Sequence, residues 1–456
     1  MLFKCHDWQS FEQRQLERLR HRVRSGDIFV FSNDPNDDAG RIDCPAERIL
    51  HAGKSEAQAI GLEHAGDTPV FWFSNDYPLH IFSRTHPAYD YYLMIEYDVV
   101  PRIDFDPIVD RLWASRVDFV GEPIRVPLAE WPWRDSCNGW YTSDQILHWL
   151  TCFAAFSNRA AHFLYERRVA AGQRLRSGEV RSLPMCEAVI PTELRLAGMN
   201  LMPLNELTTV THYNTKPYYP EARMADFPAP AILHPVLDQQ RFLAKLFDTV
   251  GSPKDLLNDR APYREIMTDE VFAAALPRIF HAMWRASDDS GCRRALAEMQ
   301  KVADPSYRRL HGLDGSNVAI GKPASQSSLS EWSLRPDDAA GPVSGPVSGM
   351  FTFHTQHEDR PWWMVDLLSI QDVSSVRVYN RMDIPARANG LGVFVSVDGH
   401  EWDLVGSHVG PRPFGGADGN PLEIAVNRPA RFVRVQLPGA GVLHLDQVQV
   451  LAASLP

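Results

Sequence analysis

The chain has 456 residues, which is too long for a single ordinary core, so two or three domains are expected. With 44% hydrophobic and 23% charged residues, the composition is typical of a soluble globular protein and excludes a disordered or fibrous one. The formal net charge of -11 argues against a nucleic-acid-binding surface, which requires clustered lysine and arginine. Sugars, or a nucleotide held in a local positive pocket, stay compatible with this composition.

Nothing in the N-terminal segment predicts export. Residues 1–23 lack the apolar run of a signal peptide, and no apolar stretch approaches the length of a membrane span. The arginine-rich segment Arg14–Arg24 is expected to be a solvated helix, with a membrane-contacting helix as the alternative. The six cysteines are scattered, without a C-x-x-C pair, which predicts reduced thiols and neither a disulfide framework nor a zinc site. A cytoplasmic protein is therefore expected.

Apolar runs and helical patterns alternate up to about residue 250, which predicts an α/β domain. The runs Asp27–Asp34 and Thr68–Asp76 both end in Ser-Asn-Asp, and Tyr89–Val100 is predicted to be a buried strand. Ser143–Gly172 is predicted to be a helix or helix pair, with Ser143 or Asp144 as the N-cap and Gly172 as the stop. Residues 255–309 have helical spacing and predict a connector.

An acidic pair, Glu96 and Asp98, ends the predicted strand of the third run. Two carboxylates two positions apart point to the same side of a strand, which suits Mg²⁺ or Mn²⁺. The competing interpretation is a solvated strand end, because acidic residues often follow strands.

The segment Ser74–Val100 resembles bacterial glycosyltransferases of GT-A type, whose strand ends in a D-x-D-like motif; here that position holds Glu96-Tyr97-Asp98. Met185–Leu204 is similar to the acceptor side of such enzymes, which implies that Glu187 is the catalytic base, while a carboxylate capping a helix near 192–196 is the alternative. Ala231–Asp238 resembles the family's His-Pro-Val stretch, which implies His234 as a third metal ligand, with His212 as its rival.

This resemblance implies a GT-A-like, Rossmann-like fold and transfer of a sugar from a nucleotide sugar in bacterial polysaccharide biosynthesis. The presence of a candidate catalytic base favours a reaction that inverts the configuration at the transferred sugar carbon. An acceptor loop is expected from the residues Asp144, Glu193, Trp131, Trp133 and Trp140, with a packed surface loop as the alternative.

After about Gly312 the pattern changes to short alternating strands separated by turns, which predicts an all-β sandwich. A site for a neutral sugar needs hydrogen-bonding groups for hydroxyls and an apolar face for the ring. His354, Arg381 and Arg387 are candidates for the first role. Trp362 and Trp363 are expected in the core, because Trp363 alternates with apolar residues along one strand face.

The ordered segments Ser316–Ser328, His354–Leu367, Val378–Asp383 and Leu443–Val450 resemble F-type (fucolectin-like) lectins, whose fold is a discoidin-like jelly roll. The resemblance implies fucose binding by His354, Arg381, Asp383 and Arg387. A turn salt bridge between Arg381 and Asp383, and a loop role for His354, are the structural alternatives.

Three features depart from the F-type pattern. Only Ile384, Pro385 and Ala386 separate Asp383 from Arg387, where the family usually has four residues. The loop 337–349 lacks the family's Asp-Gly-Asn character, and Gln447 stands where an acidic ligand is common, so calcium in this domain is doubtful.

The sequence thus predicts three parts: a GT-A-like domain at 1–250, a helical connector at 251–314 and an F-type lectin domain at 315–456. The predicted function is metal-dependent transfer of a sugar to a glycan held by the lectin domain. A lectin without catalysis is the alternative. A glycoside hydrolase is less favoured, because the carboxylates suit a metal better than a sugar cleft.

Overall fold

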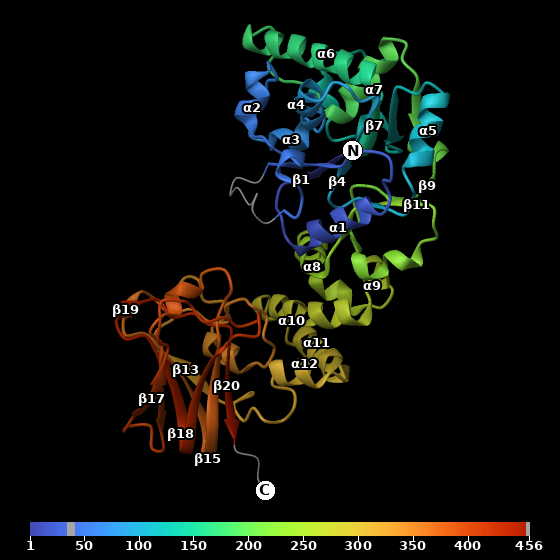
Figure 1. The fold of residues 1–456 in the computed structure, drawn as a ribbon. Helices are drawn as coiled ribbons and strands as arrows, with labels where there is room; N and C mark the ends of the chain where they lie inside the picture. Colours follow the sequence, from blue (N-terminus) through green and yellow to red (C-terminus); the bar gives the residue numbers. More distant parts are fainter. Residues whose placement is uncertain (34–41, 453–456) are drawn as a thin grey trace. The chain divides into compact units, whose positions relative to one another are not determined.

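The computed structural model describes residues 1–33 and 42–452, so Asp34, at the end of the first apolar run, lies outside the described residues. The chain divides into two compact units, Met1–Lys245 and Leu246–Pro456 (Figure 1). The helices that follow residue 250 fall within the second unit. The finer division at residues 250 and 314 stays a prediction.

A mixed seven-stranded sheet forms the centre of the first unit, in the order β3-β2-β1-β4-β7-β6-β8. Strands β1, β2, β3 and β4 are mutually parallel, and β7 is antiparallel to both of its neighbours. The strands are β1 (Leu2–Cys5), β2 (Phe29–Ser32), β3 (Ile49–His51), β4 (Tyr91–Glu96), β6 (Phe119–Pro123), β7 (Trp149–Ser157) and β8 (Leu201–Pro203).

Helices cover both faces of this sheet, so its central strands are apolar on both sides. Along β4, Tyr92 and Met94 join one core while Leu93 and Ile95 join the other. One face carries α2 (Lys54–Ala59), α3 (Val70–Phe73), α4 (Tyr77–Thr85), α6 (Asn158–Arg176) and α7 (Cys186–Leu196); the other carries α1 (Ser10–Arg20) and α5 (Asp106–Ala114) (Figure 1). The predicted α/β organisation is confirmed, whereas the GT-A assignment stays a prediction.

Small sheets extend this unit beyond the end of β4. Three short strands pair in the order β5-β11-β9, and β10 pairs with β12. These strands are β5 (Val100–Pro101), β9 (Thr209–Tyr213), β10 (Tyr219–Pro220), β11 (Ala231–His234) and β12 (Val236–Leu237), and α8 (Gln239–Thr249) follows them.

The prediction of a helix over Ser143–Gly172 is wrong for the first half of this segment. Residues Trp149–Ser157 form β7, a strand that lies between β4 and β6, and the helix begins only at Asn158. Ser157 is its N-cap, accepting a hydrogen bond from the Ala160 amide, and Gly172 lies inside the helix. A strand buried on both faces has a continuous apolar run, which cannot be told from a buried helix by periodicity.

The second unit begins with helices and continues as a β-sandwich. The helices are α9 (Pro262–Glu265), α10 (Asp269–Arg285), α11 (Asp289–Lys301) and α12 (Pro305–Leu310). Side chains of Thr268, Asp288 and Asp304 cap the last three of these at their N-termini. The helical prediction for this segment is confirmed.

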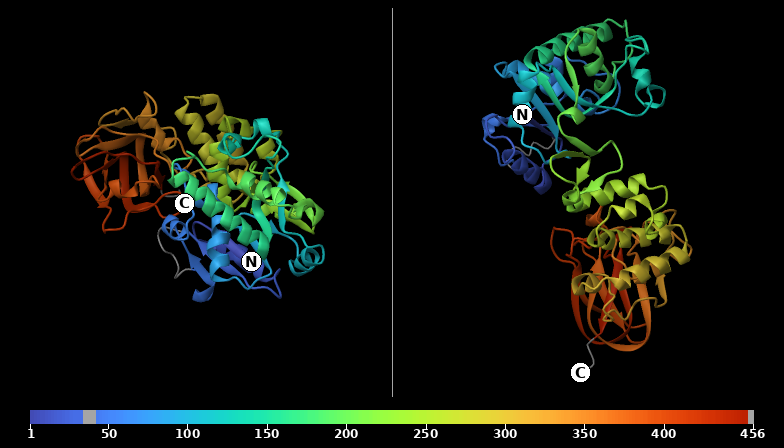
Figure 2. Two further views of the ribbon diagram at one scale, coloured as in Figure 1. Left: turned by 90° about the horizontal axis from the view of Figure 1, so that it is seen from above. Right: turned by 90° about the vertical axis from the view of Figure 1, so that its right-hand side faces the viewer.

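The sandwich, drawn in orange and red in Figure 2, is built around one pair of long antiparallel strands, of which β15 changes one partner halfway along its length. The first half of β15 pairs with β13 and its second half pairs with β20, while β18 pairs along both halves. The strands are β13 (Ala324–Gln326), β14 (Glu358–Asp359), β15 (Trp362–Tyr379), β16 (Gly392–Ser396), β17 (Asp403–Ser407), β18 (Leu422–Gln436), β19 (Ala440–Gly441) and β20 (Gln447–Ala452). Trp363 is fully buried in the core, as predicted, whereas Trp362 points to the other face of β15, is only partly buried and lies outside the core cluster.

Among the described residues, no helix has both the length and the apolar character needed to cross a bilayer. All six cysteines are free thiols, which confirms the expectation that they form no disulfide framework.

Candidate functional site

The acidic pair of the first unit lies at a characteristic place in its sheet. The chain builds β1, β2 and β3 outward on one side of β1 and then places β4 on the other side. In open α/β sheets, ligands bind at the carboxyl ends of the strands where the order reverses in this way. Glu96 is the last residue of β4 and lies opposite Lys4 of β1, so it occupies that position.

Lys4 fixes Glu96. Its Nζ lies 2.9 Å from Glu96 Oε1, donates to the Phe71 carbonyl at 2.9 Å and also donates to Asn75 Oδ1. The last contact gives a role to one of the two Ser-Asn-Asp motifs. Burial opposes ionisation of Glu96, but the charges of Lys4 and His234 outweigh it and lower the pKa of this carboxyl. Glu96 is therefore an anion at neutral pH.

Asp98 lies beside His234, although 136 positions separate them in the sequence. His234 Nε2 is 3.7 Å from Asp98 Oδ2, and the Val236 amide donates to the Asp98 carbonyl at 2.8 Å. Burial raises the pKa of Asp98 to about 6; nearby His234 acts in the opposite direction. Asp98 Oδ1 and His234 Nδ1 are both buried and have no hydrogen-bond partner in the described part of the chain. Buried polar atoms of this kind are usually satisfied by a bound water, ion or ligand.

The thiol of Cys152 lies close to Glu96 and His234. One ligand atom from each of Glu96, Cys152 and His234 lies within 4.8 Å of the other two. Cys152 comes from β7, one residue before Phe153, which pairs with Ile95 of β4. Sequence reasoning missed Cys152, because no spacing signal links it to His234. The rival ligand His212 is outside this group; its ring packs on Tyr219 at 4.6 Å.

Glu187 lies in the first turn of α7 and accepts one hydrogen bond, from Trp131 Nε1 at 3.3 Å. Burial raises the pKa of Glu187 to about 7, and the charge of Glu96 adds to the increase. A carboxyl with a pKa near 7 can exchange a proton at physiological pH, as a catalytic base must. The alternative, a favourable interaction with the helix N-terminus, is also compatible with this position.

Helix α7 also borders a hollow that is lined partly by aromatic side chains. Trp140, Tyr141 and Glu193, together with Arg167 and Arg174 of α6, line a hollow of about 340 Å³. Glu193 accepts a hydrogen bond from Tyr141 at 2.8 Å and pairs with Arg167 at 2.9 Å. Trp131 is buried and Trp133 packs edge-on against Trp72, while the Asp144 carbonyl accepts from Arg195. Of the residues expected in an acceptor loop, only Trp140 and Glu193 line this hollow.

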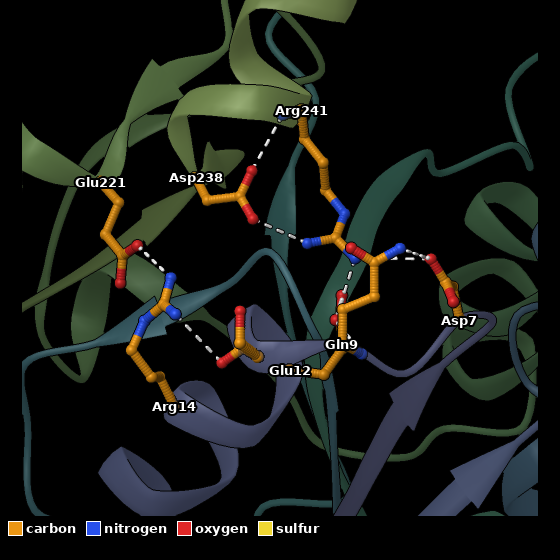
Figure 3. Close-up of polar contacts among 8 residues, drawn as sticks. Asp7, Gln9, Glu12, Arg14, Glu221, Asp238 and Arg241 are labelled. Atoms are coloured by element: carbon orange, nitrogen blue, oxygen red, sulfur yellow. Dashed lines mark hydrogen bonds and ion pairs between the residues drawn. The ribbon is translucent and has the colours of Figure 1, made fainter. Parts of the chain in front are cut away.

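An ion-pair network holds the segment that carries His234 against α1 (Figure 3). Arg241, in the first turn of α8, lies 2.9 Å from both Glu12 and Asp238 and 3.5 Å from Asp7. Glu12 is almost fully buried, and its carboxylate also accepts from the Gln9 amide at 3.0 Å. The chain after β11 is thereby tied to the segment that follows β1, and both leave the edge where Glu96 and Asp98 lie.

In the second unit, the predicted sugar-binding residues gather in one cluster. His354 is buried, and its Nδ1 donates to the Thr355 carbonyl at 2.8 Å. Burial lowers the pKa of His354, so the ring is neutral at pH 7. Its ring centroid lies 5.2 Å from that of His444, a residue that sequence reasoning quoted only as part of the closing strand.

The two arginines approach this histidine pair. The Arg381 guanidinium is bidentate to Asp383, with Nε 2.5 Å from Oδ1, and lies 4.5 Å above the Phe351 ring. Arg387 Nη1 lies 3.5 Å from His444 Nε2. Arg387 also lines a hollow of about 510 Å³ with His357, Asn389 and the segment 437–442. The salt bridge suggested as the structural alternative exists, and it holds Arg381 in the cluster.

In the loop 337–349, where F-type lectins have a calcium loop, a side-chain amide bridges two backbone groups. Gln447 accepts from the Gly345 amide at 3.0 Å and donates to the Gly341 carbonyl at 2.9 Å. Its neighbour Asp446 accepts from the amides of Ser348 and Gly349. These bonds give Gln447 a structural role in the position where the family often has an acidic ligand.

Comparison with known proteins identifies this region. Residues 348–435 match the sequence model of a family described as "NedA-like, galactose-binding domain". The C-terminal sandwich is a carbohydrate-binding, lectin-like domain. The matched segment contains His354, Arg381, Asp383 and Arg387, whereas His444 lies outside it.

Solved structures similar to the lectin-like domain each cover about a third of this chain. The lectin domain of Lectinolysin complexed with Lewis B antigen is 30% identical over 30% of this chain and 97% of its own, with a TM-score of 0.25. A Streptococcus pneumoniae fucose binding module, SpX-3, is 23% identical over 30% and 99%, with a TM-score of 0.26. A fucolectin from Morone saxatilis (striped bass) serum is 24% identical over 31% and 49%, with a TM-score of 0.26. No curated protein matches the chain.

Proposed function

We propose that this protein is a metal-dependent glycosyltransferase that moves a sugar from a nucleoside-diphosphate donor to a glycan hydroxyl. Its lectin-like domain would hold a fucosylated or related glycan, either acceptor or product. The observation that carries the catalytic part is the arrangement at the end of β4. There, Glu96, Asp98 and His234 meet where the sheet order reverses, and two of their buried polar atoms have no partner in the described chain.

The residues present fit a divalent cation. Glu96 and Asp98 supply the oxygen ligands that Mn²⁺ and Mg²⁺ accept, and His234 supplies a nitrogen. When bound there, the cation would neutralise charge on the donor diphosphate and on the leaving nucleotide. Lys4 keeps Glu96 ionised and oriented through the 2.9 Å contact, so this carboxylate needs no rearrangement to bind.

Glu187 is the residue suited to receive a proton from the acceptor hydroxyl. With a pKa of about 7, a substantial fraction is ionised at neutral pH, and the carboxyl retains enough basicity to take a proton. Trp131 holds the carboxylate through its indole N–H at 3.3 Å. A base on the acceptor side is what direct displacement at the sugar carbon requires, which favours an inverting reaction.

The alternative is a carbohydrate-binding protein without catalysis. The observation in its favour is that the family match lies within the lectin-like domain. In that case the polar group at Glu96 would be a structural cluster, and no nucleotide would be released from any sugar donor.

A screen of nucleotide sugars tests the proposal. Release of UDP or GDP is followed with the full-length protein in Mn²⁺, Mg²⁺ or EDTA, for wild type, Asp98→Asn and Glu187→Gln. Asp110→Asn, which changes an exposed carboxylate on α5, is the matched control. We expect cation-dependent release from one donor in wild type and the control, with a loss of about 100-fold or more in the other two variants. Silence across the panel from a folded, sugar-binding protein would favour the alternative.

A further inference from the structure

Cys152 distinguishes this cation site from one built of oxygen ligands alone. Its Sγ belongs to a group in which ligand atoms of Glu96, Cys152 and His234 all lie within 4.8 Å of one another. The thiol lies near the Glu96 carboxylate and contributes to lowering its pKa. A cysteine in this place is unexpected for a magnesium site, because Mg²⁺ binds oxygen ligands in near-ideal octahedral geometry.

The sheet itself places the three groups. Lys4, Glu96 and Cys152 stand side by side on β1, β4 and β7, since Lys4 pairs with Glu96 and the next residue of β7 pairs with Ile95. Lys4 contacts Glu96 Oε1, which leaves the second carboxylate oxygen for another partner. Rigid strands thus hold the carboxylate and the thiol together without a ligand.

His234 meets the same group from β11. Its Nδ1 is buried without a partner among residues 1–33 and 42–452, and its Nε2 faces Asp98 at 3.7 Å. A separation of 3.7 Å is too long for a hydrogen bond, so Asp98 does not engage this ring nitrogen. Asp98 Oδ1 also lacks a partner in the described part of the chain, which leaves it available as an oxygen ligand.

We infer that Cys152 is a ligand of the cation at this site, and that Glu96, Cys152 and His234 select a thiolate-accepting cation such as Zn²⁺ over Mg²⁺. This inference rests on the cation site of the proposed function. Zn²⁺ accepts sulfur, nitrogen and oxygen ligands, and sites with three protein ligands keep a fourth position open for substrate. On binding, the Cys152 S–H bond breaks, the sulfur bonds to the cation, and the proton leaves to solvent.

Cobalt titration of the full-length protein, after treatment with a chelator, tests this inference. A thiolate bound to Co²⁺ produces charge-transfer absorption in the near ultraviolet, which oxygen and nitrogen ligands do not produce. We expect that absorption in wild type and in the control Cys44→Ser, its disappearance on addition of Zn²⁺, and its persistence in excess Mg²⁺. Cys152→Ser and Cys152→Ala should lack it and bind Zn²⁺ at least ten-fold more weakly, since even loss of an outer partner costs roughly 10–100-fold.

Each other outcome is decisive. Co²⁺ binding without charge transfer, or with charge transfer kept in both Cys152 variants, would remove Cys152 from the site and leave the cation of the proposed function standing. If folded wild type binds none of Co²⁺, Zn²⁺, Mn²⁺ and Mg²⁺, both this inference and the metal-dependent transfer of the proposed function are overturned. Charge transfer without nucleotide release from any donor would keep this inference and contradict the transferase. Circular dichroism of the variants establishes that the fold is unchanged.

Discussion

At the scale of single residues, the two candidate sites share one property: each holds buried polar atoms that lack partners in the described chain. Asp98 Oδ1 and His234 Nδ1 are such atoms in the first unit, and His444 Nδ1 is one in the second. Asp76 differs, because its buried carboxylate is held by both Arg168 and His80. Bound water, an ion or a ligand is the usual partner of buried polar atoms that the chain leaves unpaired.

Replacing Arg381 tests the sugar site. In the proposed site, its guanidinium would donate to sugar hydroxyls, and contacts with Asp383 and Phe351 fix its plane. In Arg381→Ala, the affinity for fucose should fall by at least about 30-fold, the equivalent of about 2 kcal/mol for lost charged hydrogen bonds, as measured by isothermal titration calorimetry. Arg428→Ala, which removes an exposed arginine paired with Asp403, should bind as wild type does. Unchanged affinity in Arg381→Ala would refute the assigned site.

Asp76 predicts how stability depends on pH. Burial opposes its ionisation, but Arg168 and His80 outweigh burial and hold the pKa of Asp76 far below its usual value. A carboxyl with a depressed pKa contributes stability above the unfolded-state pKa of about 4, and this contribution is lost as pH falls further. At pH 7, the free energy of unfolding of Asp76→Asn should therefore be about 3–5 kcal/mol lower than that of wild type.

The difference between the two proteins should shrink below about pH 4, where the unfolded chain binds the proton that folded Asp76 resists. Urea denaturation at pH 7 and at pH 3 measures this difference in the free energy of unfolding. The transition of the second unit, which lacks the substitution, serves as an internal control. A difference that stays constant between these pH values would contradict the assignment.

Residue types at fixed spacing nominated only Glu96 and Asp98 from the sequence. Glu187 and His234 came from the resemblance to GT-A glycosyltransferases, and the four residues of the lectin-like domain came together through the resemblance to F-type lectins. Cys152 and His444 were not nominated. Cys152 belongs to a mostly apolar strand, and His444 follows the short strand β19 near the chain end. Only the pairing of β4 with β7, and the return of the chain past His354, bring these side chains into their sites.

At the scale of elements, period-two patterns predicted the long sandwich strands well, because one face of β15 and of β18 is partly solvated. The same reasoning failed for β7, whose two faces are both buried, so that Leu150, Phe153 and Ala154 give no alternation. In the run Thr68–Asp76, only Val70–Phe73 is helical, and a second helix follows at Tyr77–Thr85. Continuous apolar segments thus set the limit of sequence-based assignment here.

Helix α10 supports the sugar site from outside the matched family segment. His281 Nε2 donates to the Phe351 carbonyl at 2.9 Å, and the Phe351 ring lies under Arg381. Burial lowers the pKa of His281 to about 4, so the neutral ring makes this bond across the physiological range. The helix therefore holds the backbone beneath Arg381, the arginine proposed to bind sugar.

His281→Ala should weaken fucose binding by about five-fold, the equivalent of about 1 kcal/mol for one lost hydrogen bond. His400→Ala, in an exposed turn, is the control, and His281→Gln should restore part of the affinity. Calorimetry on the folded fraction separates an effect on the site from general destabilisation. Wild-type affinity in His281→Ala would show that the sugar site does not depend on α10.

At the scale of the whole molecule, one chain joins a lectin-like domain to a unit with a candidate transfer site. Tethering a glycan through one of its sugars raises the effective concentration of the remaining hydroxyls at a second site on the same chain. Such a link lowers the KM for the tethered acceptor without changing the chemical step.

Transfer kinetics should show this link. For wild type, a fucosylated acceptor should have a KM about ten-fold or more below that of the same acceptor without fucose. In Arg381→Ala the two KM values should converge while kcat stays unchanged. If wild type shows no preference for the fucosylated acceptor, the lectin-like domain does not serve acceptor capture, and product binding becomes its remaining role.

The most direct test of sugar transfer is the mass of the acceptor. A fucosylated oligosaccharide is incubated with the full-length protein, the donor that releases nucleotide, and the divalent cation, and it is then analysed by mass spectrometry. We predict a mass gain of one sugar residue with wild type, none with Asp98→Asn, and none in EDTA. An acceptor of unchanged mass under conditions in which the protein is folded and binds fucose would contradict the proposed transferase.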